Sequence, residues 1–340
     1  MTHRRILVTG ANGFIGSRLC AYLQSNGEQV IAQVRKSSNQ ELLHCIDIEK
    51  RFGDVTDSAS LEPMMRDIDV VIHNAGIVKA KQEQEFWKVN VDGTANVIDA
   101  IKKSGRSVHL ILISSLAAIG PSRGVPLDES SPMLPVTAYG ESKRDAETVA
   151  NKAAPFMQVT ILRPSGVYGP GDRESFTLFQ AVARGFKPIL GNPDRKIQLI
   201  HVDDLVRAIL NAAKLPLLTD EAPCRTYHLA DAEPYTMRQL FDQLDEVNAD
   251  MTGKRAMTIQ IPAGLLRGIA QISKTMLTLF GQTPMLTPRK AAELLGSWEV
   301  ATSRAEAELG FRSAISFRDG ARTTFAWYRQ KGWIGNGAIR

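Results

Sequence analysis

The stretch "ILVTGANGFIGSRL", residues 6–19, decides the fold, because it joins an apolar run to a helix-like pattern through three glycines. The first glycine of such a turn allows a tight reversal, the second lets backbone amides approach a pyrophosphate, and the third lets the helix pack close to the strand. The N-terminus of that helix then favours negative charge. We therefore predict a strand–turn–helix unit that binds a dinucleotide through Gly10, Asn12, Gly13, Phe14, Ile15 and Gly16.

The rest of the first half alternates short apolar runs with helix-like stretches. We predict strands over residues 6–9, 29–34, 70–73, 109–114 and 158–162, and helices over residues 15–26, 60–67, 85–104 and 139–153. Apolar strands separated by amphipathic helices are typical of βαβ units, in which a parallel sheet is covered on both faces. The sequence therefore predicts an α/β fold with a doubly wound parallel sheet.

The pattern changes after residue 162, where glycine and proline gather in "RPSGVYGPGDRE". Later segments that read as strand and helix are expected to return to the sheet, namely residues 197–213 and 226–230. We therefore assign residues 1–165 plus about 197–232 to a dinucleotide domain. The remainder, about 166–196 plus 233–340, is expected to form a smaller, mostly helical lobe over the carboxyl ends of the strands, where α/β proteins bind ligands.

The composition is ordinary for a globular protein, with 44% hydrophobic and 23% charged residues among 340. The net charge of +5 is spread along the chain, so no basic stripe indicates nucleic acid as a partner, and we expect a small-molecule substrate. No apolar run approaches the ~20 residues that span a bilayer. Three distant cysteines, Cys20, Cys45 and Cys224, suit a reducing cytoplasm.

The segment "HVDD" contains three side chains that could be read as metal ligands, His201, Asp203 and Asp204. A simpler interpretation is a strand end followed by an aspartate that caps the next helix. We therefore predict no metal site.

The end of the second predicted strand bears on the choice of cofactor. A free ribose 2′-hydroxyl usually meets an acid about twenty residues beyond the glycines, whereas a 2′-phosphate meets arginine. This chain has Arg35 and Lys36 there and no acid, which favours NADP, with NAD as the alternative. Asp54, with Val55 beside it, could accept a hydrogen bond from the adenine amine or could be an ordinary turn aspartate.

The stretch "TAYGESKRDAE" places Tyr139 four residues before Lys143, so one helix face carries both a phenol and an ammonium. A phenol of pKa ~10 is a poor base at neutral pH. A nearby ammonium and the positive nicotinamide of oxidised cofactor both favour phenolate, so we expect them to lower the pKa of Tyr139 toward the working range. The pair alone does not separate this chemistry from a solvated surface pair.

An ordered set of motifs, spanning about two-thirds of the chain, resembles the extended short-chain dehydrogenase/reductase family, the NAD(P)-dependent epimerase, dehydratase and hydroxysteroid-dehydrogenase group. The matching pieces are "TGANGFIG" (9–16), "GDVTD" (53–57), "VIHNAG" (71–76), "VNVDGT" (89–94), "ISSLAAIG" (113–120), "YGESK" (139–143), "LRPSGVYGPGD" (162–172) and "IHVDDLVRAI" (200–209).

The resemblance implies roles for individual side chains. Tyr139 would be the acid/base, with Lys143 as its activator and as a ligand of the nicotinamide ribose. Ser115 would hydrogen-bond the reacting oxygen, with Ser114 as the neighbour most easily confused with it, and Asn90 would support the site. The cofactor groove would also be lined by Asn74, Ala75, Gly76 and Pro164.

Departures from the family pattern bear on the substrate. Nucleotide-sugar members carry an asparagine and an arginine that contact the diphosphate, and the corresponding positions here hold Gly166 and Ile197. Arg195 and Lys196 lie close by in sequence and could partly substitute. "LRPSGVYGPGD" is more similar to the 3β-hydroxysteroid dehydrogenase and dihydroflavonol-reductase branches.

The segment of residues 261–281 has apolar residues at helical spacing, interrupted by Arg267 and Lys274; the apolar ones are Leu265, Leu266, Ile269, Ile272, Met276, Leu279 and Phe280. We interpret it as an amphipathic helix that packs on the lobe. A substrate lid or a helix lying on a membrane surface stays open.

Three functions remain in view. The leading one is an NADP-dependent oxidoreductase that transfers a hydride between nicotinamide and a ketone or secondary alcohol, hydrophobic or sterol-like. The second is a nucleotide-sugar epimerase or dehydratase with a tightly bound cofactor. The third is a sensor that only binds dinucleotide, which the intact Tyr139–Lys143 pair disfavours. The family resemblance also implies a homodimer.

Overall fold

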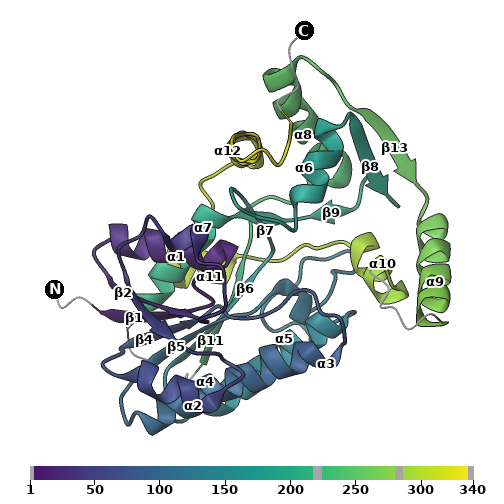
Figure 1. The fold of residues 1–340 in the computed structure, drawn as a ribbon. Coiled ribbons are helices and arrows are strands. Elements are labelled where there is room, and N and C mark those ends of the chain that lie inside the picture. Colours follow the sequence, from purple (N-terminus) through teal and green to yellow (C-terminus); the bar gives the residue numbers. More distant parts are fainter. Residues whose placement is uncertain (1–3, 217–223, 280–285, 336–340) are drawn as a thin grey trace.

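The computed structural model describes residues 4–216, 224–279 and 286–335, with residues 274–279 described by their backbone only. Its centre is a seven-stranded sheet in the order β11-β6-β5-β4-β1-β2-β3, in which every pairing is parallel. The predicted doubly wound α/β fold is thereby confirmed (Figure 1). The strands are β1 (Arg5–Thr9), β2 (Gln29–Val34), β3 (Glu49–Phe52), β4 (Val70–His73), β5 (His109–Ile113), β6 (Val159–Pro164) and β11 (Cys224–Leu229).

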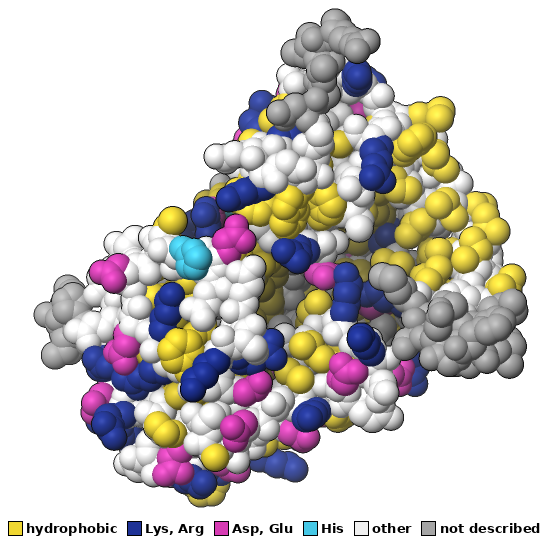
Figure 2. Space-filling model, in the orientation of Figure 1, with side chains coloured by type: hydrophobic (Ala, Val, Ile, Leu, Met, Phe, Trp, Pro, Cys, Tyr) yellow, Lys and Arg dark blue, Asp and Glu magenta, His cyan; other side chains and the backbone are white. Residues whose placement is uncertain are grey.

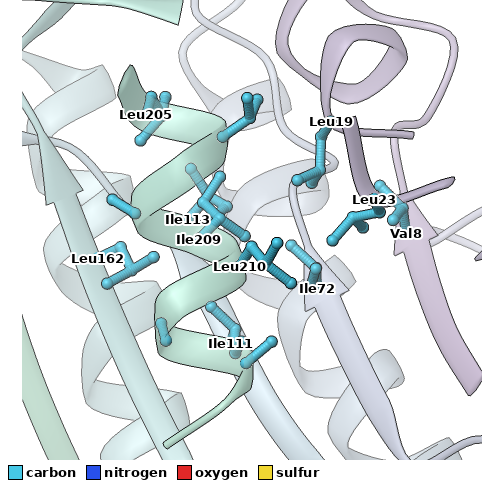
Figure 3. Packing of buried hydrophobic residues seen from close by; sticks show 14 of the residues in the cluster. Val8, Leu19, Leu23, Ile72, Ile111, Ile113, Leu162, Leu205, Ile209 and Leu210 are labelled. Atoms are coloured by element: carbon cyan, nitrogen blue, oxygen red, sulfur yellow. The ribbon is translucent and has the colours of Figure 1, made fainter. Parts of the chain in front are cut away.

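Helices bury one apolar stripe each against the two faces of this sheet. Helices α1 (Phe14–Ser25) and α7 (Val202–Ala213) share one apolar cluster with the strands. Helices α2 (Ser58–Leu61), α4 (Gly93–Lys103) and α5 (Ala138–Ala153) contribute to a second cluster on the opposite face. Figure 3 shows Leu205, Ile209 and Leu210 of α7 packed on strand residues such as Ile113 and Leu162, with Leu19 and Leu23 of α1 alongside.

Two predicted elements differ from those observed. The helix expected over residues 85–104 consists of α3 (Gln84–Phe86), a π-helical stretch η3 (Trp87–Asp92) and α4. The helix expected over residues 60–67 is α2 followed by a 3-10 turn, η2 (Glu62–Met65), which has Pro63 at its start. Strand β3, "EKRF", is a sheet edge without an apolar run. Short 3-10 turns also occur at η1 (Glu41–Leu43) and η4 (Leu116–Ala118).

The lobe forms the upper part of the molecule in Figure 1 and has its own, largely aromatic, core. Phe179 and Phe325 pack edge to face with ring centroids 4.8 Å apart, and Phe241 and Phe317 are buried with them. Its helices are α6 (Phe176–Ala183), α8 (Met237–Thr252), α9 (Ala263–Leu279), α10 (Pro288–Leu295) and α12 (Phe317–Gln330). Its strands are β7 (Gly166–Tyr168), β8 (Phe186–Leu190), β9 (Lys196–Ile197), β10 (Leu199–His201), β12 (Tyr235–Thr236) and β13 (Met257–Ile261).

The chain passes between the sheet domain and the lobe more often than the predicted domain boundaries imply. Strand β10 pairs with β7 in a separate two-stranded sheet, although α7 and β11 join the large sheet layer as expected. Helix α11 (Ser303–Leu309) also packs there, with Ala305 and Leu309 in the cluster of α1 and α7, so this part of residues 233–340 packs on the sheet layer and not in the lobe core. Helical periodicity shows that a face is buried but not which layer buries it.

None of the helices in the described ranges is both long enough and apolar enough to cross a membrane.

Candidate active site

The predicted site residues gather where the parallel strands end. Arg35 follows β2, Asp54 follows β3, Asn74 follows β4 and Ser115 follows β5, while Pro164 is the last residue of β6. Because all these strands run in the same direction, their carboxyl ends lie along one edge of the sheet. The strand order reverses between β1 and β4, directly beside the glycine turn. Figure 2 shows the surface hollowed between this edge and the lobe.

The glycine turn has no room for side chains. Gly10 has a φ of 63°, and a Cβ there would lie 2.9 Å from Ala75 Cα. A Cβ on Gly16 would overlap the carbonyl oxygen of Gly10. Gly13 is the N-cap of α1 and offers no capping side chain, so the first amides of α1 remain available to an anion. This cradle fits the pyrophosphate of a dinucleotide.

The other predicted residues of this turn lie around it. Asn12 donates from its side chain to Asn39 O, 3.0 Å away, and thereby holds the loop after β2 against the turn. Ile15 is half-buried in the packing between α1 and the sheet. The Phe14 ring lies against Gly171 of the lobe, so the turn and the lobe meet at this point.

Buried polar residues that sequence reasoning missed fix this turn. The Gln33 side chain accepts a hydrogen bond from Gly10 N at 3.2 Å and donates to Gly53 O. The Thr9 hydroxyl accepts from Ala75 N at 3.0 Å and contacts His73 Nδ1 at 2.8 Å. Burial lowers the pKa of His73 to about 3, so its ring is neutral. The available signal was a polar residue inside an apolar strand, since Gln33, Thr9 and His73 all lie in strands.

The residues expected to choose the cofactor lie at the end of β2 and β3. Arg35 has 62% of its side chain exposed, and its Nη1 lies 3.8 Å from Asp54 Oδ2. Lys36 is exposed next to it. Asp54 Oδ1 accepts from both the amide and the hydroxyl of Thr56 at 2.9 Å, which makes it a turn aspartate as well as a partner of Arg35. Val55 is buried against Gly93 at the start of α4.

The two neighbouring serines after β5 have different surroundings. Ser114 is buried, and its hydroxyl donates to Glu147 Oε1. Ser115 is half-buried, caps η4 by accepting from Ala117 N at 3.1 Å, and hydrogen-bonds the Tyr139 phenol. The structure therefore places Ser115, and not Ser114, beside Tyr139.

Helix α5 carries Tyr139 and Lys143 on the face next to β5. Its N-cap is Thr137, whose hydroxyl accepts from Gly140 N at 3.2 Å, and Gly140 lets the helix approach Ala117 O closely. The Lys143 ammonium donates to Ile113 O at 2.6 Å. Close packing of the helix N-terminus on η4 thus brings the phenol and the ammonium to the end of β5.

In the ligand-free protein the pKa of Tyr139 lies above its ordinary value. Burial raises it to about 12, with further increases from Glu293 and Glu174, while the Ser115 hydrogen bond partly opposes them. Burial also lowers the pKa of Lys143 to about 8, although Glu147 counteracts this. The lowering expected from Lys143 together with the oxidised nicotinamide is thus not present in the ligand-free protein, where desolvation of the phenolate dominates. At neutral pH Tyr139 is a neutral phenol and Lys143 is mostly an ammonium.

Asn90 lies in the π-helical stretch η3 and links three segments of the site. Its Oδ1 accepts from Ile77 N at 2.9 Å, and its Nδ2 donates to Ile77 O at 3.1 Å and to Ser142 Oγ at 2.9 Å. Ser142 in turn donates to Tyr139 O. Asn90 therefore fixes the loop after β4, including Gly76, against helix α5, and π-helical turns are frequent at functional sites.

A buried ion pair that the sequence did not reveal fixes α5 to strand β6. Arg163 on β6 binds Glu147 through two nitrogens, with Nε 3.0 Å from Oε1 and Nη2 2.7 Å from Oε2. The same carboxylate accepts from Ser114 and lies one helical turn from Lys143. The pair joins β6 to the helix that carries the site.

The "HVDD" segment serves the fold, with one correction. The N-cap of α7 is His201, whose Nδ1 accepts from Asp203 N at 3.3 Å, and not an aspartate. Asp203 binds Arg18 of α1, with 2.9 Å between Oδ2 and Nη2, and Asp204 accepts from Ala314 N and Ile315 N at 3.0 Å. Pro164, for its part, is buried and pairs with Leu229 of β11.

Known proteins share this chain's sequence and architecture. The sequence model described as the NAD dependent epimerase/dehydratase family matches residues 6–221. A ceramide reductase of Caulobacter vibrioides is 31% identical, with 97% of this chain and 96% of that protein covered. A 3 beta-hydroxysteroid dehydrogenase/Delta 5-->4-isomerase of Mycobacterium tuberculosis is 26% identical over 95% of this chain and 90% of its own length.

One solved structure, MoeE5 in complex with UDP-glucuronic acid and NAD, is 25% identical, with a TM-score of 0.74 and coverage of 96% of this chain and 99% of that one. The family model covers the glycine cradle and the Tyr139–Lys143 helix, and the two relatives and MoeE5 span nearly the whole chain, lobe included. The chain is therefore an enzyme of the NAD-dependent epimerase/dehydratase family, within the extended short-chain dehydrogenases/reductases.

Proposed function

We propose that the enzyme is an NADP-dependent reductase that acts on a ketone group of a lipid-like molecule. In nucleotide-sugar enzymes the positions of Gly166 and Ile197 hold residues that contact the diphosphate. The proposal rests on the two cations nearest to Ile197 in sequence, Arg195 and Lys196, which already bind other groups of the chain. Arg195 donates to Gly296 O at 3.0 Å, and Lys196 lies 3.3 Å from the Glu299 carboxylate. Both cations therefore have partners in the segment of residues 296–299, which follows α10.

The surroundings of the two replaced positions agree with this interpretation. Ile197 packs at the border of the aromatic lobe core, and Gly166 is exposed beside Leu199. An apolar substrate suits such surroundings better than a diphosphate, which needs fixed positive charge or backbone amides. The ceramide reductase relative, by its name, acts on a lipid, and we extend that substrate class to this chain.

The protonation states favour catalysis in the reductive direction. A neutral Tyr139 can donate its proton to a ketone oxygen, and Ser115 can donate a hydrogen bond to the same oxygen as charge develops on it. The Lys143 ammonium then stabilises the phenolate that remains. When bound, the nicotinamide supplies the hydride, and the glycine cradle, Asn74 and Lys143 would hold the cofactor.

Arg35 supports NADP as the cofactor. Its exposed guanidinium is free to turn toward a 2′-phosphate, since its contact with Asp54 is a 3.8 Å pair between exposed groups. The acid that would receive a ribose 2′-hydroxyl is missing directly after β2. NAD remains the alternative, because the Asp54 carboxylate lies beside Arg35 and is able to accept the ribose 2′-hydroxyl in place of the missing acid.

Steady-state NADPH oxidation tests the proposal. Long-chain and sterol-like ketones in mixed micelles would be compared with small aliphatic ketones and with UDP-sugars. We expect turnover of the apolar ketones with equal amounts of NADPH consumed and alcohol formed. Preference for a small ketone would contradict the lipid-like substrate, and preference for NADH would contradict the role of Arg35.

A nucleotide-sugar epimerase is the second candidate, favoured by the similarity to MoeE5, whose structure holds UDP-glucuronic acid and NAD. Such an enzyme regenerates its cofactor in each turnover. Conversion of a UDP-sugar without net change in NAD(P)H, by protein that retains cofactor through purification, would establish it instead.

A further inference from the structure

The edge of the lobe formed by β8, β13 and α9 exposes apolar side chains. We call the following six residues the apolar patch: Phe186, Met257, Ile259, Leu265, Ile269 and Ile272. They make up half of the large hydrophobic side chains that are exposed in the described part of the chain. Figure 2 shows hydrophobic side chains gathered along this edge, over β13 and α9. A cluster of this kind indicates an interaction surface, since scattered single exposures are the norm.

The patch follows from the geometry of its two elements. Phe186 and Met257 are paired in register between the parallel strands β8 and β13, and Ile259 points to the same side two residues later. Leu265, Ile269 and Ile272 recur at helical spacing on one face of α9. Met257, Leu265 and Ile272 have 65%, 55% and 65% of their surface exposed.

Helix α9 has a second apolar face, and that face is the buried one. Leu266 and Ala270 pack against Ala291 and Leu295 of α10. The expectation that α9 is an amphipathic helix packed on the lobe is therefore right for this face and incomplete for the other. Of the residues named in that expectation, the side chains of Lys274, Met276 and Leu279, and all of Phe280, lie outside the described part.

The chain segment that carries β13 and α9 is basic, although Asp242 and Asp245 of α8 face its start, where they pair with Lys187 and Arg255 at 2.9 Å and 3.5 Å. Residues 251–292 contain no aspartate or glutamate, but they contain six basic residues: Lys254, Arg255, Arg267, Lys274, Arg289 and Lys290. Lys254, Arg255 and Arg267 are exposed within or beside the patch. Exposed apolar side chains on a segment with an excess of basic residues are complementary to a bilayer surface that carries anionic lipids.

The patch is separated from the candidate site by one helix. Helix α10 packs on the inner face of α9, as Figure 1 shows. From α10, Arg289 reaches Glu141 of α5 at 3.4 Å, two residues after Tyr139. The Glu293 carboxylate of α10 is also near enough to act on Tyr139. The α9–α10 pair thus joins the outer apolar surface to the helix that carries the site.

We propose that the apolar patch rests on the surface of a bilayer that contains anionic lipids, and that this contact brings a membrane-dissolved ketone to the site. The docking itself is independent of the enzyme's reaction, whereas the delivery of substrate rests on the proposed function. The mode of contact is interfacial: the apolar side chains enter the headgroup region and the basic side chains meet the lipid charges.

Co-sedimentation of the full chain with vesicles, in the absence of cofactor and substrate, tests the docking. Vesicles of phosphatidylcholine with phosphatidylglycerol would be compared with phosphatidylcholine alone. We expect binding to the anionic vesicles and a loss of at least about tenfold in partitioning for Leu265→Ser/Ile269→Ser/Ile272→Ser. Arg267→Gln/Lys254→Gln should weaken binding roughly tenfold on anionic vesicles. Phe156→Ser, which alters an equally exposed apolar residue outside the patch, is the matched control and should bind as the wild type does.

Two results would overturn the proposal. One is equal or no sedimentation of the wild type with both kinds of vesicle. The other is a wild type that fails to bind vesicles but is a dimer by light scattering, with the triple variant a monomer, which would make the patch a contact between copies. A circular-dichroism spectrum and a urea unfolding midpoint equal to those of the wild type show that the triple variant is folded. Since sedimentation requires no turnover, failure of the reductase proposal would leave this result unaffected.

Discussion

At the scale of single residues, the site depends on how burial sets protonation. Tyr139 has a pKa of about 12 and Lys143 a pKa of about 8, and desolvation is the main cause of both shifts. The phenol is thus kept as a proton donor while the ammonium beside it stays mostly charged at neutral pH. The sequence identified both residues by their spacing, but it could not give these pKa values, because burial is a property of the tertiary structure.

Replacing Tyr139 with phenylalanine should remove the proton donor without disturbing the cofactor cradle. We expect kcat for ketone reduction to fall by roughly 10²–10⁴-fold, the usual contribution of general acid catalysis. The dissociation constant for NADPH, measured by fluorescence titration, should stay within about twofold of the wild type, since ligand contacts of the cradle are backbone groups of other segments. A variant that binds NADPH and retains full turnover would refute the role of Tyr139.

Replacing Arg35 with serine should affect the two cofactors differently. A charged hydrogen bond to the 2′-phosphate is worth about 1.5–3 kcal/mol, so KM for NADPH should rise roughly tenfold or more. KM for NADH provides the internal control and should change little. An equal rise of KM for NADPH and for NADH would show that Arg35 acts on the loop structure and not on the 2′-phosphate.

At the scale of elements, helix α5 is fixed at two points along its length. Its N-terminus packs on η4 through Gly140, and its third turn is fixed to β6 by the Glu147–Arg163 pair. The π-helical stretch η3 presents Asn90 to the same helix. Sequence patterns predicted where this helix begins and ends to within one residue, but they could not reveal that partners on three other elements position it.

Replacing Glu147 with glutamine should be strongly destabilising, because Arg163 would be left buried without a countercharge. Breaking such a pair costs about 3–5 kcal/mol of unfolding free energy, to be measured by urea denaturation. The exposed pair of Lys103 with Glu62, 3.7 Å apart, offers the matched control: Glu62→Gln should change stability by less than about 0.5 kcal/mol. Equal effects of the two substitutions would contradict the importance of burial at Glu147.

The limits of prediction for strands and helices also have physical causes. Strands β1, β2, β4, β5 and β6 were predicted because parallel strands buried on both faces read as continuous apolar runs. Strand β3 lacks such a run because it is at the sheet edge. The cap of α7 was misassigned to an aspartate because His201 is an uncommon N-cap, whereas aspartate is a frequent one.

At the scale of the whole molecule, the lobe and the sheet layer meet around buried polar groups. Asp231 follows β11, and Asp204 of α7 and Tyr235 of the lobe are near enough to affect the pKa of its carboxyl group. Burial, and then the Asp204 charge, raises the pKa of Asp231 to about 7. This junction links the protonation of one carboxyl to the stability of the molecule as a whole.

The folded protein should hold the Asp231 proton to higher pH than the unfolded chain does. Its contribution to stability is therefore fully present below the ordinary pKa of ~3.9 and is lost as pH rises toward about 7. Buried histidines act in the opposite sense, because their lowered pKa values make stability rise with pH over part of this range. The histidines contribute equally to the wild type and to a variant that lacks the Asp231 carboxyl. The difference in unfolding free energy between the two proteins therefore reports the contribution of Asp231 alone.

The unfolding free energy of Asp231→Asn, measured by denaturant titration from pH 4 to pH 8, should increase relative to that of the wild type as pH rises. The slope of this difference should reach at most about 1.4 kcal/mol per pH unit, the limit for one proton. A difference that does not change with pH would contradict the raised pKa of Asp231.

Hydride transfer from cofactor to substrate carbon separates the reductase from an epimerase at the level of the complete enzyme. NADPH deuterated at the transferring position would be incubated with a long-chain ketone and, separately, with a UDP-sugar, and the products analysed by mass spectrometry. We predict one deuterium in each alcohol molecule formed and one NADPH consumed per alcohol. Interconversion of the UDP-sugar with no net NADPH consumption, and no deuterium in the ketone product, would contradict the proposed reduction.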